Sequence, residues 1–343
     1  MSLPEIAYCP STLANGFNTY SATALKKVFF GKKVNHILPF NPPQLDEDVA
    51  EIFRQNRKIL SISGVQIKQS LRLEKNELRI TQEGEQGQYI LKPIPHRESF
   101  GLIDQLPANE HLTMQIASQV YKLNVAENAL IFFKNGEPAY ITKRFDLKED
   151  GSKLNQEDFA TLLGRTRESA GDIFKNEGSY ETLAKAMKKY IPAYPVEIEK
   201  FYSLVIFNYL FSNGDAHLKN FSVQTTANGD HILSPAYDLI NTRIHIKDDT
   251  AMALTDGLFD NDYETASFKE NAFYAYDDFY DFGLKIGIVA SRVKKLLDKL
   301  RTPQVLTSKL ISASFLSINT KKRYTDYYED RLKALNYSYH KKI

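Results

Sequence analysis

The residue types best suited to chemistry gather in one ten-residue string, Asn213-Gly-Asp-Ala-His-Leu-Lys-Asn-Phe-Ser222, directly after an apolar stretch. The carboxylate of Asp215 could accept a proton from a hydroxyl group, and the amide oxygen of Asn220 could ligate a hard cation. Either residue alone could equally form a turn, because Asp and Asn side chains readily bond to nearby backbone groups. So many polar residues directly after an apolar segment do not belong to a hydrophobic core, so the whole string favours a functional site.

A second string of interest is Ser234-Pro-Ala-Tyr-Asp-Leu-Ile-Asn-Thr242. Its Asp238 follows Asn220 at a distance of 18 residues. A hairpin around Asn228-Gly229 fits that gap and would return the chain to the first string. Protein kinases keep the spacing found between Asp215 and Asn220, and they carry a second metal-binding Asp downstream. Taken alone, Asp238 could instead cap the segment that follows it.

A serine-containing loop, Leu60-Ser-Ile-Ser-Gly-Val-Gln-Ile-Lys68, precedes the first expected strand pair. Ser61, Ser63 and Gly64 could direct backbone N–H groups at phosphate oxygens. With one glycine, the loop is neither a Walker A loop nor a GxGxxG loop, so an ordinary β-turn is the alternative.

Two further positions fit a nucleotide site. Lys92 ends an apolar run and resembles the strand lysine that reaches ATP phosphates in kinases, and Glu110 could be its ion-pair partner. The stretch Thr142-Lys-Arg-Phe-Asp146 lies where the hinge of a two-lobed kinase meets adenine. A solvated edge lysine and an ordinary strand end are the alternatives for these two positions.

The elements that must position these residues change in character near residue 145. Alternating apolar residues and turn signals predict strands at 71–74, 77–80, 89–92, 129–134 and 138–145, with one helix that starts at Asn109 as its N-cap. Helical spacing predicts helices at 22–30, 156–163, 180–190, 197–211, 284–300 and 305–316. We therefore expect an α+β protein with a strand-rich first half and a helical second half.

The overall composition excludes several classes of protein. The 343 residues carry 44 Lys and Arg against 42 Asp and Glu, and this net charge of +2 provides no general attraction to DNA or membranes. A single cysteine, Cys9, forms no internal disulfide, and the seven histidines show no zinc-binding spacing. The densest apolar run, Leu204–Phe211, is too short to span a bilayer, and the first residues lack the pattern of a signal peptide. We expect a soluble, cytoplasmic protein.

Several motifs occur in the order in which HipA-type toxin kinases carry them: SISGVQIK, YILKP, Asn109-Glu110, RFD, QEDF, NGDAHLKNFS and SPAYDLINT. The chain therefore resembles that family over residues 58–260, and its compact length and Ser-Ile-Ser loop look most like the HipT branch. The resemblance implies a two-lobed, protein-kinase-like α+β fold. Its expected parts are a reduced N-terminal segment (1–57), a kinase N-lobe with the phosphate loop (58–145) and a helical C-lobe (146–343).

The resemblance also implies a site for ATP and Mg²⁺, with Asp215 as the catalytic residue and Asn220 and Asp238 as the Mg²⁺ ligands. The implied ATP contacts are Ser61, Ser63 and Gly64 in the phosphate loop, Lys92 at the phosphates, the backbone of Lys143 and Phe145 at adenine, and Asp146 at the ribose. Ser61 and Ser63 are also the implied autophosphorylation sites, whose modification would eject the loop and block ATP binding. The hinge reads KRFDL where longer members commonly carry ERFDR, so any contact from a Glu side chain is lost. His217 matches a family histidine, and the sequence assigns it no role.

The biological setting implied by the resemblance is a type II toxin-antitoxin system. Family members phosphorylate a serine of an aminoacyl-tRNA synthetase and so inhibit translation. The implied partners are a HipB-like helix-turn-helix antitoxin, DNA through that antitoxin only, and a separate small protein that resembles the missing N-terminal subdomain.

Two other functions remain open at this point: a kinase-like phosphotransferase for small molecules, and a catalytically silent scaffold in a repressor complex. The complete set of Asp215, Asn220, Asp238 and Lys92 disfavours the scaffold. The Ser61 and Ser63 loop disfavours the small-molecule enzyme, because a self-phosphorylated serine loop belongs to the protein kinases of this family.

Overall fold

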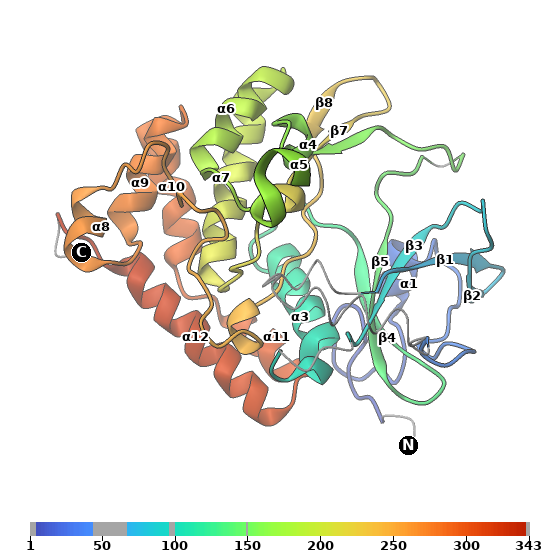
Figure 1. The fold of residues 1–343 in the computed structure, drawn as a ribbon. Coiled ribbons are helices and arrows are strands. Elements are labelled where there is room, and N and C mark those ends of the chain that lie inside the picture. Colours follow the sequence, from blue (N-terminus) through green and yellow to red (C-terminus); the bar gives the residue numbers. More distant parts are fainter. Residues whose placement is uncertain (1–4, 44–66, 96–99, 149, 341–343) are drawn as a thin grey trace.

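A sheet at one end of the molecule and a group of helices at the other make up the computed structural model (Figure 1). It describes residues 5–43, 67–95, 100–148 and 150–340. In this part of the chain, antiparallel strands form a five-stranded sheet in the order β2-β1-β3-β5-β4. They are β1 (Gln69–Glu74), β2 (Glu77–Ile80), β3 (Tyr89–Pro93), β4 (Asn128–Phe132) and β5 (Pro138–Lys143). The strand-rich first half and the helical second half confirm the predicted α+β fold.

Tight turns set the register of the two hairpins in this sheet. Lys75 joins β1 to β2 with a positive φ of 56°, and the hairpin pairs Leu73 with Leu78. Gly136 joins β4 to β5 with a φ of 89°. In both turns a residue in the left-handed region reverses the chain. All five predicted strands are confirmed to within two residues at their ends.

The N-terminal segment, which has little regular structure, packs onto this sheet. Its short helix α1 (Ala22–Val28) is as the sequence predicted, to within two residues. The Tyr20 hydroxyl donates a hydrogen bond to the Leu130 carbonyl at 2.8 Å, and the Tyr89 hydroxyl donates to the Val28 carbonyl at 2.9 Å. Buried side chains of this segment share one hydrophobic cluster with those of β3, β4 and β5. The described part of residues 1–57 therefore belongs to the core of the sheet.

Helix α3 (Leu106–Gln119) lies between the sheet and the other helices (Figure 1). The prediction that Asn109 caps this helix is wrong, because the helix begins three residues earlier, with Pro107 in its first turn. Asn109 lies inside the helix and is fully buried, and its side-chain amide donates to the Asn241 carbonyl at 2.8 Å. A buried polar side chain of α3 thus bonds to the segment that carries the second motif.

The helical part is built around α7 (Tyr194–Leu210), which packs against α6 (Tyr180–Tyr190) and α10 (Ala290–Arg301). The other longer helices in the described residues are α9 (Tyr276–Lys285), α11 (Val305–Ala313) and α12 (Ile318–Asn336). The shorter ones are α4 (Phe159–Leu162), α5 (Arg167–Ala170) and α8 (Ala266–Asn271). A small sheet in the order β6-β7-β8 is formed by β6 (Gln156–Asp158), β7 (Ser222–Thr225) and β8 (His231–Leu233).

Two of the segments predicted as single helices are not single helices in the structure. Residues 156–163 hold strand β6 and then α4, because β6 pairs with β7 and Asp158 caps the helix by accepting a hydrogen bond from the Thr161 N–H at 2.9 Å. Residues 284–300 hold the end of α9 and most of α10, which are separated at Gly287 with its left-handed φ of 90°. Helix α12 was not predicted from the sequence, whereas α6 lies at its predicted bounds.

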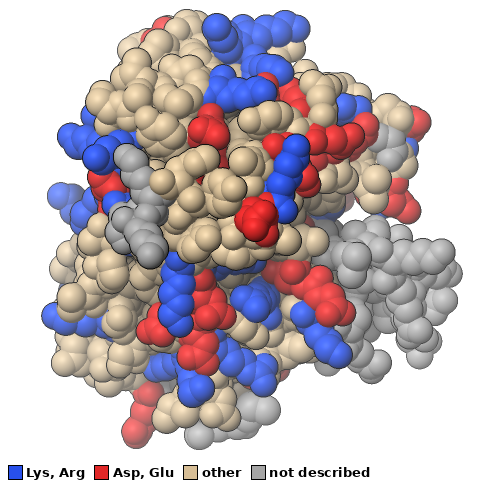
Figure 2. Space-filling model, turned by 90° about the vertical axis from the view of Figure 1, so that its left-hand side faces the viewer, with Lys and Arg blue, Asp and Glu red and all other residues tan. Residues whose placement is uncertain are grey.

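The surface carries mixed charge. On the face shown in Figure 2, Lys and Arg side chains lie among Asp and Glu side chains, in agreement with the net charge of +2. None of the described helices combines the length and the apolar character that crossing a membrane requires.

Candidate active site

The loop that carries Asp215 begins where the buried helix α7 ends. After Leu210 the chain turns at Ser212, whose φ of 52° is left-handed. Asn213 then bonds back to the helix, since its N–H donates to the Asn208 carbonyl at 2.8 Å and its side-chain amide donates to Asn208 Oδ1 at 2.9 Å. A fully packed helix therefore holds the start of this loop in place.

Segments that are distant in sequence hold the rest of the loop. The Leu218 N–H donates to the Lys175 carbonyl at 2.9 Å, and the Tyr180 hydroxyl of α6 donates to the Ala216 carbonyl at 2.9 Å. The position of Asp215 is thus set by α7, by α6 and by the loop that precedes α6.

Gly214, next to Asp215, has no room for a side chain. A Cβ atom at this position would lie 2.3 Å from Asp249 Oδ1 and 2.7 Å from the Thr250 carbonyl oxygen. The Gly214 N–H donates to Thr242 Oγ1 at 2.7 Å, and the Thr242 hydroxyl donates to the Asp249 carboxylate. Burial raises the pKa of Asp249 to about 6. Close backbone packing here requires glycine and ties the Asp215 loop to residues 242–250.

Asp215 lies beside a buried imidazole. His217 Nε2 is 3.7 Å from Asp215 Oδ1, and burial lowers the pKa of His217 to about 4. The imidazole is therefore neutral near pH 7. Neither of its ring nitrogens has a hydrogen-bond partner among the described residues. A small movement would allow a hydrogen bond between His217 and Asp215, which suits a residue that orients the carboxylate.

The two residues predicted to bind Mg²⁺ are adjacent. Asn220 Nδ2 is 3.4 Å from Asp238 Oδ2, and Asp238 takes a strained, left-handed φ of 56°. Asn220 Oδ1 is buried and has no hydrogen-bond partner among the described residues. An unused amide oxygen next to a carboxylate fits Mg²⁺, which prefers oxygen ligands and commonly takes the rest from water and phosphate. The described chain holds no cluster of three or more His, Cys, Asp or Glu that could cage a metal unaided.

A buried lysine connects the sheet to this pair. Lys92 Nζ lies 2.6 Å from Glu110 Oε1 of α3 and also donates to Asp238 Oδ1, so the predicted ion pair between Lys92 and Glu110 is confirmed. Burial raises the pKa of Glu110 to about 7 in spite of Lys92. Burial also opposes ionisation of Asp238, but the attraction of Lys92 and of Lys68, whose Nζ is 3.9 Å from Asp238 Oδ2, lowers its pKa to about 2. Of the two carboxylates that share Lys92, Asp238 therefore keeps its charge more firmly.

The predicted adenine hinge is bonded within the protein. The Lys143 N–H donates to a carbonyl just before β4, and the Phe145 carbonyl accepts a hydrogen bond from the Gln224 side chain at 2.8 Å. The Asp146 carboxylate accepts a hydrogen bond from Arg144, with 2.9 Å between Arg144 Nε and Asp146 Oδ1. A carbonyl oxygen can accept two hydrogen bonds, so Phe145 could still contact a base. The nucleotide contacts of Lys143, Phe145 and Asp146 stay predictions, and Ser61, Ser63 and Gly64 lie outside the described residues.

Comparison with known proteins identifies the family to which this fold and site belong. Residues 60–305 match the family described as HipA-like C-terminal domain. The chain belongs to this family. A Haemophilus influenzae protein named "Putative kinase" is 28% identical to this HipA-like chain over 329 residues, which cover 92% of each protein.

A second relative and a solved structure extend this comparison. "Putative kinase Y4dM" of Sinorhizobium fredii is 31% identical over 229 residues, which cover 62% of this HipA-like chain and about half, 52%, of that protein. The HipA structure from Shewanella oneidensis MR-1, solved with HipB and operator DNA, has a TM-score of 0.57 at 20% identity and covers 86% of this chain and 71% of that chain. The HipA-like fold is therefore shared, and the predicted family is confirmed. The closer resemblance to HipT stays a prediction.

The HipA-like site also contains residues that the sequence analysis missed. Lys175 is 8% exposed and lines the same pocket as Asp215, yet no motif or periodic pattern marks it. Lys68 and Thr242 could have been predicted from the sequence, because each is the last residue of a motif described above. Assigning a role to every position of those motifs would have found both.

Proposed function

We propose that this chain is a serine/threonine protein kinase that transfers the γ-phosphate of ATP to a protein hydroxyl, as the toxin of a type II toxin-antitoxin system. The observation that carries the proposal is the connected set of Glu110, Lys92 and Asp238. Active protein kinases require an ion pair between a strand lysine and a helix glutamate together with a metal-binding Asp. Membership of the HipA-like family and the names of the relatives support the same activity.

Each residue has a separate task in this proposal. Lys92 neutralises phosphate charge. The oxygen atoms of Asn220 and Asp238 would hold Mg²⁺, which would supply positive charge to offset the charge that develops on the phosphates. Asp215 orients the acceptor hydroxyl and accepts its proton. As this happens, the hydroxyl oxygen bonds to the γ-phosphorus and the bond from that phosphorus to the bridging oxygen breaks, which releases ADP.

The charges around Lys92 suit this chemistry. The low pKa of Asp238 keeps its carboxylate ionised and ready for a metal across the physiological range. The pKa of Glu110, at about 7, lets this side chain take up a proton when the local negative charge rises. A bound Mg²⁺ would share Asp238 with Lys92 and so free part of the lysine charge for phosphate.

The proposed setting and regulation follow from the family. HipA of Shewanella oneidensis was solved with HipB and operator DNA. For this chain we propose a HipB-like antitoxin, DNA contact through that antitoxin only, a small partner that resembles the N-terminal subdomain of longer HipA proteins, and a synthetase serine as the substrate. Phosphorylation of Ser61 or Ser63 would add about −1.5 to −2 charges to the phosphate loop and would weaken ATP binding.

Incubation with labelled ATP, Mg²⁺ and a cell lysate tests the proposal. We expect label on a serine of a cellular protein and, by peptide mapping, on Ser61 or Ser63. A double Ser61→Ala, Ser63→Ala variant is the matched control for self-labelling. Label that appears on small molecules alone would favour a small-molecule phosphotransferase, and a folded protein that neither binds nor turns over Mg-ATP would favour the silent scaffold.

A further inference from the structure

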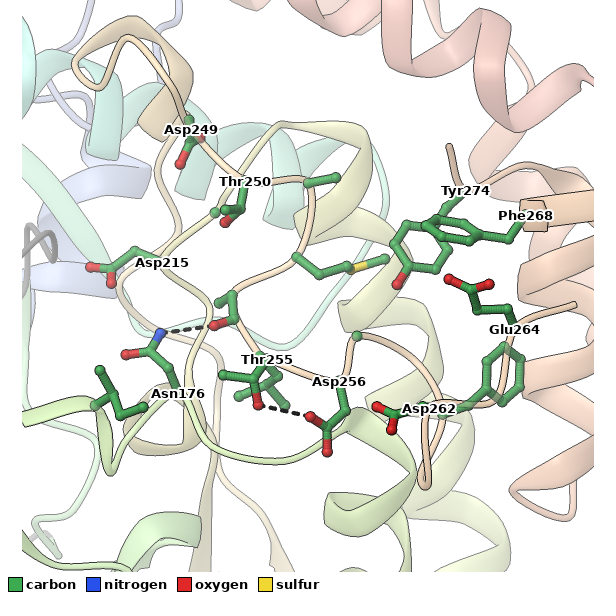
Figure 3. Close-up of a pocket in the computed structure, with 18 of the residues that line it drawn as sticks. Asn176, Asp215, Asp249, Thr250, Thr255, Asp256, Asp262, Glu264, Phe268 and Tyr274 are labelled. Carbon is green, nitrogen blue, oxygen red and sulfur yellow. Dashed lines mark hydrogen bonds between the residues drawn. The ribbon is translucent and has the colours of Figure 1, made fainter. Parts of the chain in front are cut away.

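The segment that runs from Asp238 to Thr250 contributes to two parts of the site. At its start, Asp238 lies next to the other proposed Mg²⁺ ligand. At its end, Asp249 and Thr250 line the pocket of about 620 Å³ that Asp215 also lines (Figure 3). Contacts that fix this segment therefore affect both a metal ligand and the surroundings of the proton acceptor.

The backbone of Asp238 is strained at the point where its carboxylate must be directed. Its φ of 56° lies in the left-handed region, which a residue other than glycine rarely occupies. In this conformation one carboxylate oxygen contacts Lys92 and the other lies 3.4 Å from Asn220 Nδ2. A strained conformation persists only where the surrounding structure holds it. The contacts of the residues that follow Asp238 therefore help to decide where its two oxygens point.

Helix α3 holds these following residues through the side chain of Asn109. The Asn241 N–H donates to Asn109 Oδ1 at 3.2 Å, and Asn109 Nδ2 donates to the Asn241 carbonyl at 2.8 Å. One fully buried amide group thus bonds both backbone groups of Asn241. Ile240 and Leu106 of α3 also share a buried apolar cluster. The segment is therefore attached to α3 directly after Asp238.

A buried histidine fixes the orientation of the Asn109 amide. His245 Nδ1 lies 2.9 Å from the Gly101 carbonyl oxygen, and a carbonyl can only accept, so Nδ1 carries the proton. His245 Nε2 then accepts the second hydrogen of Asn109 Nδ2, at 2.8 Å. Burial lowers the pKa of His245 to about 4, so this imidazole is neutral near pH 7. A reversed amide would set its oxygen against two acceptors, Nε2 and the Asn241 carbonyl, so only one orientation is favourable.

Asn109 and Glu110 are neighbours on α3 and contact different parts of the site. Glu110 pairs with Lys92 of β3, and Asn109 bonds to the segment that follows Asp238. Lys92 and Asp238 contact each other in turn. These contacts form a closed ring, in which a rotation of α3 would move both of its ends together. Active kinases need the lysine–glutamate pair and the metal-binding Asp in place at the same time.

We propose that Asn109 is a positioning residue for the metal site, because its amide ties the Asp238 segment to α3 and so keeps the Asp238 carboxylate directed at Mg²⁺. His245 acts through Asn109, since it holds the amide in the orientation that bonds Asn241. This inference rests on the proposed function and adds to it the means by which the site is ordered for Mg-ATP. Neither Asn109 nor His245 is assigned a contact with ATP or Mg²⁺.

Calorimetry on the full chain, with ATP in Mg²⁺ and with ATP in EDTA, tests this role. The ratio of the two dissociation constants measures how strongly Mg²⁺ improves binding. Asn109→Leu is similar in size and removes the polar atoms. We expect it to lower this ratio at least about tenfold and to change the affinity in EDTA less than about threefold. The reason is that Lys92 still contacts phosphate without the metal, whereas the effect of Mg²⁺ depends on Asp238.

His111→Leu is the matched control. His111 is also fully buried on α3, but its Nε2 lies 2.8 Å from the Ser11 carbonyl oxygen in the N-terminal segment. This variant should lower thermal stability and keep the wild-type ratio. His245→Phe should lower the ratio by less than Asn109→Leu does, because both bonds to Asn241 remain. Asn109→Ser removes the amide without adding bulk, and it replaces the leucine variant if that variant does not fold.

Hydrogen exchange in the metal-free protein gives a second measurement. In Asn109→Leu, peptides that cover residues 238–245 should exchange at least about tenfold faster than in the wild type, because the Asn241 N–H loses its acceptor. Unchanged exchange there, or a wild-type ratio in the folded Asn109 variants, would overturn the positioning role and leave the kinase proposal standing. An equal loss of the ratio in His111→Leu would also overturn it. A wild-type protein that does not bind Mg-ATP would refute the proposed function, and this inference with it.

Discussion

Replacing Lys92 with Met should destabilise the protein strongly, and by an amount that depends on pH. The Lys92 side chain is 5% exposed and lies between Glu110, at 3%, and Asp238, at 18%. Methionine approximates the length of the lysine stem and removes the charge. The variant therefore leaves two largely buried carboxylates without their shared cation.

The expected cost follows from that burial. Removal of one partner from a buried ion pair destabilises a protein by about 3–5 kcal/mol. The free energy of unfolding of a typical domain is only about 5–15 kcal/mol, so this loss is a large part of it. Exposed pairs are worth about 0–1 kcal/mol. Lys27→Met is therefore the matched control, because Lys27 and Glu127 are 3.6 Å apart and about half exposed. We expect a small effect in the control and a large one in Lys92→Met at pH 8.

The dependence on pH has a definite sign. The folded-state pKa of Glu110, at about 7, is raised above the usual value of 4.5 for a glutamate, so the folded protein holds a proton that the unfolded chain releases. The corresponding stability is fully present below about pH 4.5 and is lost as pH rises through the folded-state pKa. Without Lys92 this pKa moves higher. If the pKa of Glu110 exceeds 8 in the variant, the variant loses stability over one pH unit more than the wild type does between pH 5.5 and pH 8. At about 1.36 kcal/mol per unit, the difference in unfolding free energy between wild type and variant then grows by about 1.4 kcal/mol over this range.

Urea unfolding at pH 5.5 and pH 8 measures this effect, with far-UV circular dichroism as the signal because the chain contains no tryptophan. We expect Lys92→Met to lose several kcal/mol at pH 8 and clearly less at pH 5.5. Stability within about 0.5 kcal/mol of the wild type at pH 8 would refute the reasoning, because exposed pairs alone account for changes that small. A deficit of the same size at both pH values would show that the two carboxylates do not titrate as described.

Three further predictions concern the loop and the metal ligands. Asp215→Asn should abolish phosphoryl transfer at unchanged thermal stability, because the nearly isosteric amide cannot accept the hydroxyl proton, and transfer at the wild-type rate would rule out its role as the proton acceptor. Asp238→Ala should weaken Mg-ATP binding in calorimetry more than Asn220→Ala, since a carboxylate is the stronger ligand of a hard cation, and wild-type affinity in both variants would contradict the metal assignment. Gly214→Ala should lower kcat at least about tenfold, because its Cβ would lie 2.7 Å from the Thr250 carbonyl oxygen, a backbone atom, so the loop must move. Wild-type kcat in this variant would show that the loop position is not critical.

Local sequence patterns predicted most of the elements that carry the site. The hairpins around Lys75 and Gly136 follow from turn residues between alternating apolar positions, and the structure shows both. Helix α6 follows from a clean helical spacing and was placed at its observed bounds. Where distant contacts override the local pattern, the prediction failed: residues 156–158 form a strand because β7 is available to pair with them.

The pairings within the site were only partly visible in the sequence. Lys92 and Glu110 were linked because a strand lysine and a helix glutamate are a known pair, but the further contact to Asp238 joins residues 146 positions apart. Lys175 was missed altogether, since burial next to Asp215 is what makes an ordinary lysine noteworthy.

The sequence by itself determined which side chains could do chemistry here, because the order and spacing of Asp215, Asn220 and Asp238 are properties of the chain. It also determined most strands and helices, since these depend on neighbours within a few residues. The tertiary structure alone decided the charge states of these groups, the shape of the pocket that Asp215 and Lys175 line, and the position of α3. The physical reason is that desolvation, ion pairing and cavity shape depend on atoms brought together from distant parts of the chain, and no local pattern records them.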